Sequence, residues 1–360
     1  MRTSYQNNPA VIALKKQARA TGTPLFGGFE LTSRCNLDCK MCYVHNLDVS
    51  EALRTELSTE QWISIMDAAY DNGMLFALLT GGECLLRKDF KELYMHLYNK
   101  GVFVSVNTNG VLIDEEMADF FRQHMPERIQ ISLYGSSNAC YERVTGYRQF
   151  DRVFRALKLL KERKLPVEIG VTPSSWLVDD FKEILLRIKE LDLPFYVTSA
   201  LIEPREDTHR EGDYLSDDQK LLILRQELEH RGIAITPTDR PAPPAGCPDG
   251  DVVKGMPCNA GTIRFFVTSQ GKMIPCASID SVSINALEND FVSCWNYIHD
   301  KMSEVIQPSK CQKCVYNKYC DMCPAVRYPG LFDGKADERL CLYQQKKFNA
   351  GLIRVQCDES

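Results

Sequence analysis

The run LTSRCNLDCKMCYVHN, residues 31–46, decides how the rest of the chain is interpreted. It follows an apolar stretch, residues 25–31, that is typical of a buried strand, and it places Cys35, Cys39 and Cys42 in the pattern C-x3-C-x2-C. Iron–sulfur clusters usually take four protein thiolates, so three thiolates would leave one iron of a four-iron cube open. An open metal position is what chemistry at a metal requires. A zinc knuckle or three buried cysteines is the alternative.

A second apolar stretch, residues 74–80, ends in Gly81-Gly82-Glu83. Glycines let a backbone approach a ligand closely, and an ammonium group favours oxygen acceptors. A C-x3-C-x2-C run after a first strand, with GGE after the second, resembles the radical S-adenosylmethionine (SAM) superfamily.

The resemblance implies an oxidoreductase with SAM and a [4Fe-4S] cluster held by Cys35, Cys39 and Cys42. One electron from the cluster would cleave SAM, and the resulting 5′-deoxyadenosyl radical would abstract hydrogen from a substrate. Gly81, Gly82 and Glu83 would receive the SAM amino group. An external electron donor such as flavodoxin or ferredoxin is also implied.

Composition narrows the class of protein. The 360 residues allow one large domain and a smaller one, and 44% hydrophobic with 25% charged residues is ordinary for a globular protein. A net charge of −5 gives no reason to expect nucleic acid, and no apolar run reaches the roughly 18 residues of a membrane span. There is no signal-peptide core. Fifteen cysteines in such a chain favour metal ligation in a reducing compartment, so we expect a cytoplasmic protein.

Six apolar stretches alternate with helical patterns, which favours a parallel α/β fold with right-handed crossovers. Six units are short of an eight-fold barrel. The family resemblance selects a partial (β/α)6 TIM-like barrel, whereas periodicity alone leaves a doubly wound sheet open. The expected strands are residues 25–32, 74–80, 102–106, 129–133, 167–171 and 195–199. The expected helices are residues 8–20, 58–70, 89–100, 114–124, 150–164 and 179–190.

We expect four parts in the chain: a helical arm at 1–24, the barrel at 25–200, a bridge at 201–256 and a cysteine-rich domain at 257–360. The bridge contains a helical pattern at about 216–231 and a Pro-rich stretch. The arm is basic, which fits either a helix docked on the body or a contact for an acidic partner. It is too short for a peptide-binding domain of its own. A peptide substrate would therefore need the arm, the bridge or a separate leader-recognition protein.

The C-terminal cysteines follow a second pattern. Cys258, Gly271 and Cys276 have the spacing C-x12-G-x4-C across an expected hairpin, and Cys311-x2-Cys314-x5-Cys320-x2-Cys323 and Cys341 follow. This resembles the SPASM domain, except for x2 in place of x3 before Cys323. The resemblance implies two auxiliary [4Fe-4S] clusters. Cys247, Cys258, Cys276 and Cys323 would hold the first, and Cys311, Cys314, Cys320 and Cys341 the second. A zinc ribbon on Cys311 and Cys314 is the alternative.

Further candidate residues follow the expected strands, where barrel chemistry is placed. Asn107, a cofactor-binding candidate, follows the third strand, and Ser132 lies at the end of the fourth. Family resemblance places a serine and an arginine on the SAM carboxylate and ribose, which makes Ser132 and Arg143 cofactor-binding candidates. An arginine matches a carboxylate with two parallel hydrogen bonds. Arg143 is otherwise a surface charge, and Tyr43 is a candidate for packing by the adenine.

Three residues are catalytic candidates. Cys84 directly follows GGE, where it either packs as a small apolar residue or donates a hydrogen atom or contacts substrate. Tyr134 lies just after the fourth strand. Glu203 follows the sixth strand as a general base or a ligand for a substrate amine, unless it is solvated.

The pairing of a radical SAM core with two auxiliary clusters predicts a maturase for a ribosomally made peptide (RiPP maturation), forming a crosslink or another oxidative modification. The auxiliary clusters would accept an electron or bind a substrate thiolate. One alternative is formylglycine formation as in anaerobic sulfatase maturases, but Ala277 stands where that family has its base. Others are a small-molecule or tetrapyrrole dehydrogenase or epimerase, and a metal-stapled binding module without catalysis. A binding module without catalysis is expected to have lost cysteines of the C-x3-C-x2-C motif or residues of GGE, and both motifs are intact.

Overall fold

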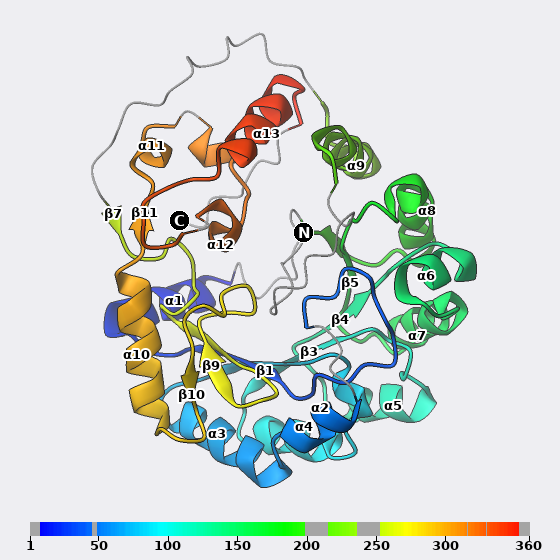
Figure 1. Cartoon of the computed structure of the whole chain (residues 1–360). Coiled ribbons are helices and arrows are strands. Elements are labelled where there is room, and N and C mark those ends of the chain that lie inside the picture. The colour runs from blue at the N-terminus through cyan, green and yellow to red at the C-terminus, as the bar shows by residue number, and fades with distance from the viewer. Residues whose placement is uncertain are drawn as a thin grey trace.

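A curved nine-stranded sheet with helices along its outer side forms the body of the molecule (Figure 1). The computed structural model describes residues 8–44, 49–198, 215–235, 253–314, 316–328 and 330–352. The strand order is β10-β9-β8-β1-β2-β3-β4-β5-β6, and β1 to β6 are all parallel. The sheet strands are β1 Phe26–Glu30, β2 Phe76–Thr80, β3 Phe103–Thr108, β4 Arg128–Ser132, β5 Val167–Val171, β6 Phe195–Val197, β8 Arg264–Val267, β9 Lys272–Ile274 and β10 Ile284–Asn285. The short strands β7 Val253–Lys254 and β11 Ile306–Gln307 pair separately.

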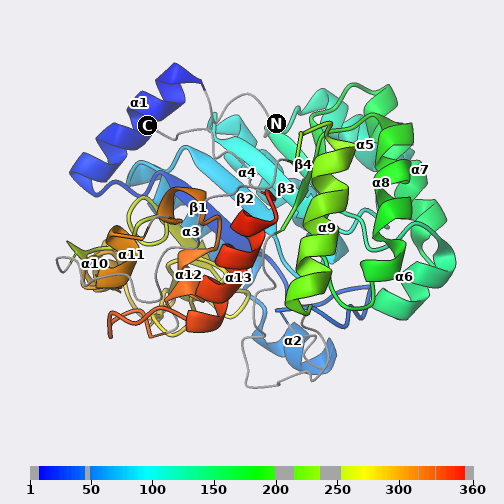
Figure 2. The ribbon, with the colours of Figure 1, turned by 90° about the horizontal axis from the view of Figure 1, so that it is seen from above.

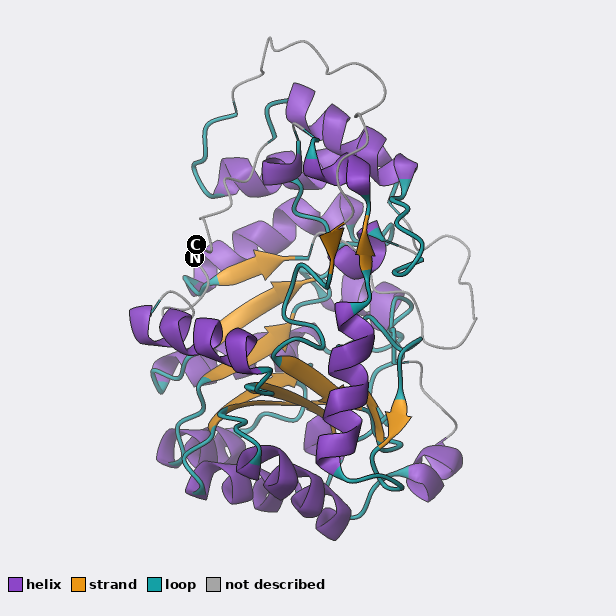
Figure 3. Cartoon of the chain, turned by 90° about the vertical axis from the view of Figure 1, so that its left-hand side faces the viewer, coloured by secondary structure: helices purple, strands orange, loops and turns teal. Residues whose placement is uncertain are grey.

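Helices follow most strands, as the alternating pattern predicts, and the partial barrel is confirmed. Figure 2 shows α8 and α9 side by side along one flank, and Figure 3 shows the strands as one twisted layer. No helix in the described part of the chain is long and apolar enough to cross a membrane. The helices are α1 Pro9–Thr21, α2 Val49–Thr55, α3 Thr59–Asp71, α4 Phe90–Asn99, α5 Glu115–Gln123, α6 Asn138–Thr145, α7 Phe150–Glu162, α8 Phe181–Leu191, α9 Asp217–His230, α10 Phe291–Ser303, α11 Ser309–Gln312, α12 Pro324–Arg327 and α13 Glu338–Asn349, with 3-10 turns at Cys84–Leu86, Val178–Asp180 and Asn317–Tyr319.

The two faces of the barrel strands differ in chemistry. On the outer face, residues such as Val104, Ile129 and Ile131 are buried and apolar. The opposite face carries polar side chains, and the strand register places them beside one another. We call this set the polar wall: Ser105, Asn107, Gln130, Ser132 and Tyr196. The barrel interior is therefore suited to a ligand that forms hydrogen bonds.

The expected C-terminal hairpin forms as β8 and β9, and it extends the barrel sheet. Strand β8 runs parallel to β1, with Gly28 opposite Phe266. A Cβ atom on Gly28 would lie 2.3 Å from Phe266 Cδ2, so a glycine is needed for the strands to pair. Phe265 packs edge-on against Phe29, with ring centroids 5.9 Å apart. The region expected to be a separate C-terminal domain thus shares a sheet and a core with the barrel.

The N-terminal helix α1 docks on the body of the molecule. Its buried Ala18 joins a small apolar cluster with Phe26 and Phe76. Arg19 Nη2 donates a hydrogen bond to Asn259 Oδ1 (2.7 Å), and Trp295 Nε1 donates to the carbonyl of Gly22 (2.7 Å). These contacts favour the docked helix over the free basic arm.

Candidate active site

The loop with the three N-terminal cysteines is held by the end of α6. The backbone N–H of Asp38 donates to the carbonyl of Thr145 (2.9 Å), and that of Lys40 donates to Val144 (3.0 Å). The ammonium group of Lys40 also lies 5.2 Å from the ring centroid of Trp176. The loop is therefore fixed at the carboxyl ends of the strands, where the barrel opens.

The thiols of this loop lie close together. Burial raises the pKa of Cys35 to about 12, and the charges of Glu83 and Cys42 add to the rise. Burial also raises the pKa of Cys39, and the charges of Cys42 and Cys35 contribute. Three neighbouring thiolates, one buried and two half-buried, would require a strong positive charge, and iron coordination supplies one. The donor set therefore fits the [4Fe-4S] cluster that the motif predicts.

Polar side chains from two neighbouring strands reach these thiols. Asn109 Nδ2 donates to Cys35 Sγ (3.6 Å) and to Asn36 Oδ1 (2.7 Å). The Tyr134 hydroxyl forms a hydrogen bond with the Cys39 thiol, and burial raises the pKa of Tyr134. Tyr134, a catalytic candidate from the sequence, is thus placed to support a cluster ligand.

The GGE segment packs directly on the cysteine loop. The N–H of Gly82 donates to the carbonyl of Thr32 (2.7 Å), and that of Glu83 donates to Arg34 (2.8 Å). A Cβ atom on Gly82 would lie 2.4 Å from the Arg34 oxygen, and one on Gly81 would lie 2.5 Å from that of Thr32. The two glycines are therefore needed for this backbone contact, besides any contact with a ligand.

The carboxylate of Glu83 is buried and well supplied with donors. Its oxygens accept from Thr108 Oγ1 (2.8 Å), from the N–H of Asn109 (2.7 Å) and from the N–H of Leu85 (3.1 Å). Burial raises the pKa of Glu83, and these hydrogen bonds oppose the rise. A cationic ligand here would meet a preorganised anion.

The neighbouring Cys84 is also fully buried, and its thiol donates to the carbonyl of Asn107 (3.4 Å). Among the described residues, Asn107 Oδ1 is buried and has no hydrogen-bond partner. An unpaired buried oxygen at the end of β3 fits a site that a ligand completes.

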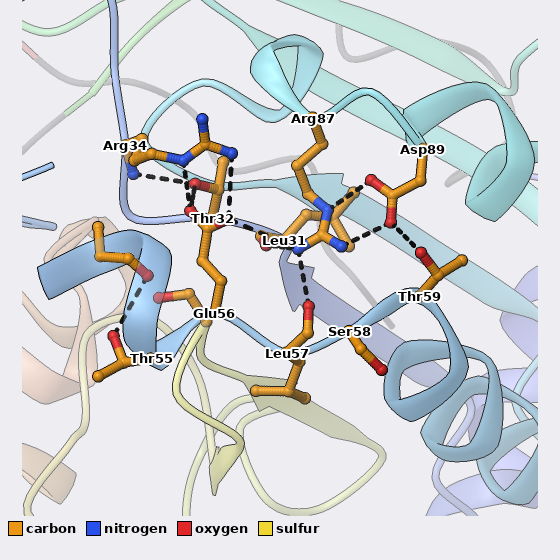
Figure 4. A network of polar contacts seen from close by, with 12 residues as sticks. Leu31, Thr32, Arg34, Thr55, Glu56, Leu57, Ser58, Thr59, Arg87 and Asp89 are labelled. Carbon is orange, nitrogen blue, oxygen red and sulfur yellow. Dashed lines mark hydrogen bonds and ion pairs between the residues drawn. The ribbon is translucent and has the colours of Figure 1, made fainter. Parts of the chain in front are cut away.

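A polar network absent from the sequence predictions holds the start of the cysteine loop (Figure 4). Glu56 accepts from Arg34 Nε (2.7 Å) and Nη2 (3.0 Å), and from the hydroxyl of Thr32. Arg87 forms two hydrogen bonds with Asp89, at 2.8 and 2.6 Å. It also donates to the carbonyls of residues 31 and 57, both at 3.0 Å. The network ties the end of β1 to the linker before α3.

The remaining candidate residues of the barrel lie in different surroundings. Arg143 donates to the carbonyl of Trp176 (3.3 Å) and to Cys140 Sγ (3.3 Å), near the residue on which Lys40 stacks. Ser132 lies on the polar wall and hydrogen-bonds Tyr134. Tyr43 is partly buried at the end of the cysteine loop. Their SAM-binding roles stay predictions, and Glu203 lies outside the described residues.

Seven C-terminal cysteines gather into two groups. The charge of Cys323 contributes to the raised pKa of both Cys258 and Cys276, although burial is the main cause in each case. Burial likewise raises the pKa of Cys341, and the charges of Cys311, Cys314 and Cys320 add to it. The first C-terminal group is therefore Cys258, Cys276 and Cys323, and the second is Cys311, Cys314, Cys320 and Cys341. Cys247, expected in the first group, lies outside the described residues.

The SPASM resemblance implies this division, with Cys247 added to the first set, and the ligand roles stay predictions. Within the described ranges, no three His, Cys, Asp or Glu side chains are arranged to hold one metal ion. A four-iron cluster bonds each thiolate to a different iron, so its ligands need not converge on one point. The auxiliary clusters stay predictions.

Known proteins resemble this chain in sequence and in fold. Residues 29–188 match the model of the radical SAM superfamily. The AdoMet-dependent heme synthase of Methanosarcina barkeri is 24% identical over 355 residues, which cover 91% of this chain and 99% of the relative. The PqqA peptide cyclase of Xanthomonas euvesicatoria pv. vesicatoria is 29% identical over 292 residues, which cover 76% of this chain and 74% of the relative.

Among solved structures, Streptococcus suis SuiB bound to its precursor peptide SuiA matches with a TM-score of 0.62 at 18% identity, covering 86% of this chain and 74% of that one. At this identity the likeness concerns the fold.

Proposed function

We propose that this chain, whose residues 29–188 match the radical SAM model, is a radical SAM enzyme that oxidatively modifies a ribosomally made peptide. The observation that carries the proposal is the gathering of seven C-terminal cysteines into two groups beside the barrel. Two further iron–sulfur sites would suit an oxidation, because a substrate radical must lose an electron to become a closed-shell product. We propose a crosslink or a similar change as the outcome.

The cysteine loop would hold the first cluster, which together with SAM would supply a 5′-deoxyadenosyl radical for hydrogen abstraction. The buried carboxylate of Glu83 would attract the SAM ammonium group. Asn109 and Tyr134 would donate hydrogen bonds to the ligating sulfurs of Cys35 and Cys39 and so stabilise their negative charge. Asn107 Oδ1, which has no partner among the described residues, would accept from the bound ligand.

The polar wall supports a substrate that forms hydrogen bonds, as a peptide backbone does. Two buried oxygens strengthen this: Asn107 Oδ1 on the wall and Thr198 Oγ1, two residues after Tyr196, have no hydrogen-bond partner in the described part of the chain. Such groups are costly unless a ligand pairs with them. A relative named a peptide cyclase and a neighbour bound to a precursor peptide point the same way. We also propose an external electron donor and a separate leader-recognition protein as partners, in a reducing compartment.

A tetrapyrrole substrate is the second candidate. It is favoured by the match to a heme synthase over nearly the whole length of both chains. The polar wall suits the apolar face of a macrocycle less well. Formylglycine formation ranks lower, because Ala277 offers no base and the nearby Asp280 is exposed to solvent.

The first experiment measures iron and sulfide per chain after anaerobic reconstitution, and 5′-deoxyadenosine after reduction with SAM. We expect about twelve irons, four for each of three clusters, and SAM cleavage. A variant with Cys35, Cys39 and Cys42 changed to alanine is the matched control: it should keep the C-terminal iron and lose all SAM cleavage. Retained cleavage in this variant would overturn the assignment.

The second experiment identifies the substrate class. Short peptides encoded near the gene and a propionate-bearing porphyrin are each incubated with the loaded enzyme and SAM. A mass loss of about two hydrogens in a peptide, absent in the triple-alanine control, supports the proposal. Stoichiometric SAM cleavage and porphyrin oxidation, with every peptide unchanged, would replace it with the tetrapyrrole function.

A further inference from the structure

Arg34, the residue directly before Cys35, is held through both its backbone and its side chain. Its N–H donates to Thr32 Oγ1 (3.0 Å), and its carbonyl accepts from the N–H of Glu83 (2.8 Å). Its guanidinium donates to both carboxylate oxygens of Glu56, from Nε (2.7 Å) and from Nη2 (3.0 Å) (Figure 4). Two parallel charge-assisted bonds of this kind fix an arginine in one orientation. The conformation of Arg34 is therefore set from outside the cysteine motif.

Glu56 lies just after α2, outside both the cysteine motif and the GGE segment. Its N–H donates to the carbonyl of Ala52 (2.9 Å), and its side chain is largely buried. Arg87 Nη1 lies 3.8 Å from Glu56 Oε2, and Arg87 is itself paired with Asp89. The two arginines and the two carboxylates balance in charge. We therefore expect Glu56 to act on the cysteine loop through geometry and not through a net charge.

Arg34 belongs to a closed ring of contacts around the candidate site. Its carbonyl receives the N–H of Glu83, and the carboxylate of Glu83 accepts from the N–H of Asn109 (2.7 Å). Asn109 Nδ2 in turn donates to Cys35 Sγ (3.6 Å), and Cys35 is bonded to Arg34 along the chain. The ring therefore connects the first thiol of the cysteine loop with the buried carboxylate of Glu83.

The ring has little room to adjust where the GGE segment meets residues 33 and 34. A Cβ atom on Gly82 would lie 2.4 Å from the carbonyl oxygen of Arg34 and 2.5 Å from that of Ser33. In such close packing, a shift of Arg34 also moves the backbone that carries Glu83. A ligand that reaches both a cluster at Cys35 and this carboxylate needs their spacing fixed to within about 0.5 Å.

We infer that Glu56 is a positioning residue for SAM. By holding Arg34, it sets the spacing between the thiol of Cys35 and the carboxylate of Glu83. The inference rests on the proposed function, because it requires a cluster at the cysteine loop and the SAM ammonium group at Glu83. Glu56 itself would touch neither the cluster nor SAM, since its carboxylate is occupied by Arg34 and by the hydroxyl of Thr32.

The test measures SAM binding separately from SAM cleavage. The full chain with Glu56→Gln is reconstituted anaerobically, and its iron content is determined. Its dissociation constant for SAM is measured by anaerobic equilibrium dialysis, and 5′-deoxyadenosine formation is followed over a range of SAM concentrations. We expect full iron and a dissociation constant and KM about tenfold higher, because a charge-assisted bond is lost. The kcat should change less than about twofold, because the cluster remains and saturating SAM restores the bound state.

Glu227→Gln is the matched control. Glu227 on α9 is also a buried glutamate that is ion-paired with an arginine, Arg231 (3.0 Å), but it lies outside the ring. This change should lower the free energy of unfolding and leave the dissociation constant for SAM unchanged. A comparable loss of SAM affinity in Glu227→Gln would overturn the inference, since the effect would then reflect general stability.

A double variant tests whether Glu56 acts through Arg34. Arg34→Gln alone should also raise the dissociation constant for SAM by about tenfold. Adding Glu56→Gln to it should raise the constant by less than about twofold more, because the two residues act as one unit. Independent effects that multiply would overturn the inference.

The remaining outcomes separate the inference from the proposed function. Unchanged SAM affinity in Glu56→Gln with full iron would overturn the inference and leave the proposed function standing. If Glu56→Gln binds about four fewer irons per chain, Glu56→Asp decides: it keeps the charge but shortens the reach, and an unchanged dissociation constant in it overturns the inference. Absence of SAM binding in the parent protein would overturn the inference together with the proposed function.

Discussion

Replacing Gly28 with alanine tests whether the barrel sheet continues into the C-terminal half. The added Cβ would lie 2.3 Å from Phe266 Cδ2 and 3.0 Å from its Cε2, far inside ordinary contact. Phe266 is 5% exposed and cannot swing into solvent without losing its packing. Overpacking a close-packed core costs about 1–3 kcal/mol, and we expect Gly28→Ala to lower the free energy of unfolding by about 2 kcal/mol.

The assay is anaerobic urea denaturation of the cluster-loaded protein, followed by the fluorescence of tryptophans including the buried Trp62. The double variant Gly28→Ala/Phe266→Ala provides the decisive comparison. Phe266→Ala alone should cost about 3–5 kcal/mol, because it leaves a cavity. In that background the added methyl group has room, so Gly28→Ala should cost less than about 0.5 kcal/mol. Additive effects of the two changes would refute the pairing of β1 with β8.

Three further outcomes follow from side chains already described. Arg87→Met should lower the free energy of unfolding by about 2 kcal/mol in urea denaturation, because the buried carbonyls of residues 31 and 57 lose their donor and the half-buried Asp89 loses its ion pair; a loss below about 1 kcal/mol would contradict the role of the network. Tyr134→Phe should keep the iron content but alter the paramagnetic resonance spectrum of the reduced SAM-binding cluster, since the Cys39 sulfur loses a donor; an identical spectrum would contradict this contact. Burial, followed by the charges of nearby cations, lowers the pKa of His230, so the folded state disfavours the protonated form. The free energy of unfolding should therefore fall as the pH drops below the ordinary histidine pKa of about 6.5. His230→Gln should make this fall smaller, as measured by denaturation curves at pH 7 and pH 5.5. An equal fall in both proteins would contradict the role of His230.

The strands could be predicted from sequence because they are buried on the outer face and flanked by helical periodicity. Thus residues 167–171 were expected as a strand and form β5 with those bounds. Helix α6 was missed because it has only eight residues, although Ser137 caps it and its buried residues Cys140, Tyr141 and Val144 have helical spacing. Helix α10 was missed because the interpretation of the C-terminal region relied on cysteine spacing alone.

The pairing of β8 with β1 joins residues more than two hundred positions apart, and no local pattern encodes it. The candidate site likewise combines local motifs, which the sequence shows, with contacts between distant loops, which it does not. Cysteine spacing and GGE are local motifs, so the sequence could suggest them. The network of Glu56, Arg87 and Asp89 and the contacts of Asn109 and Tyr134 with thiols depend on which loops meet in space.

The position of β8 beside β1 has a consequence for any attempt to separate the two halves of the chain. Strand β1 is an interior strand only because β8 covers one of its sides. Without residues after 256, β1 would become an open edge whose row of N–H and C=O groups could pair with another chain, and its two glycines carry no side chain to block such pairing. A barrel expressed alone would therefore be prone to aggregate, and the cysteine-rich half of the chain also protects the sheet of the catalytic half.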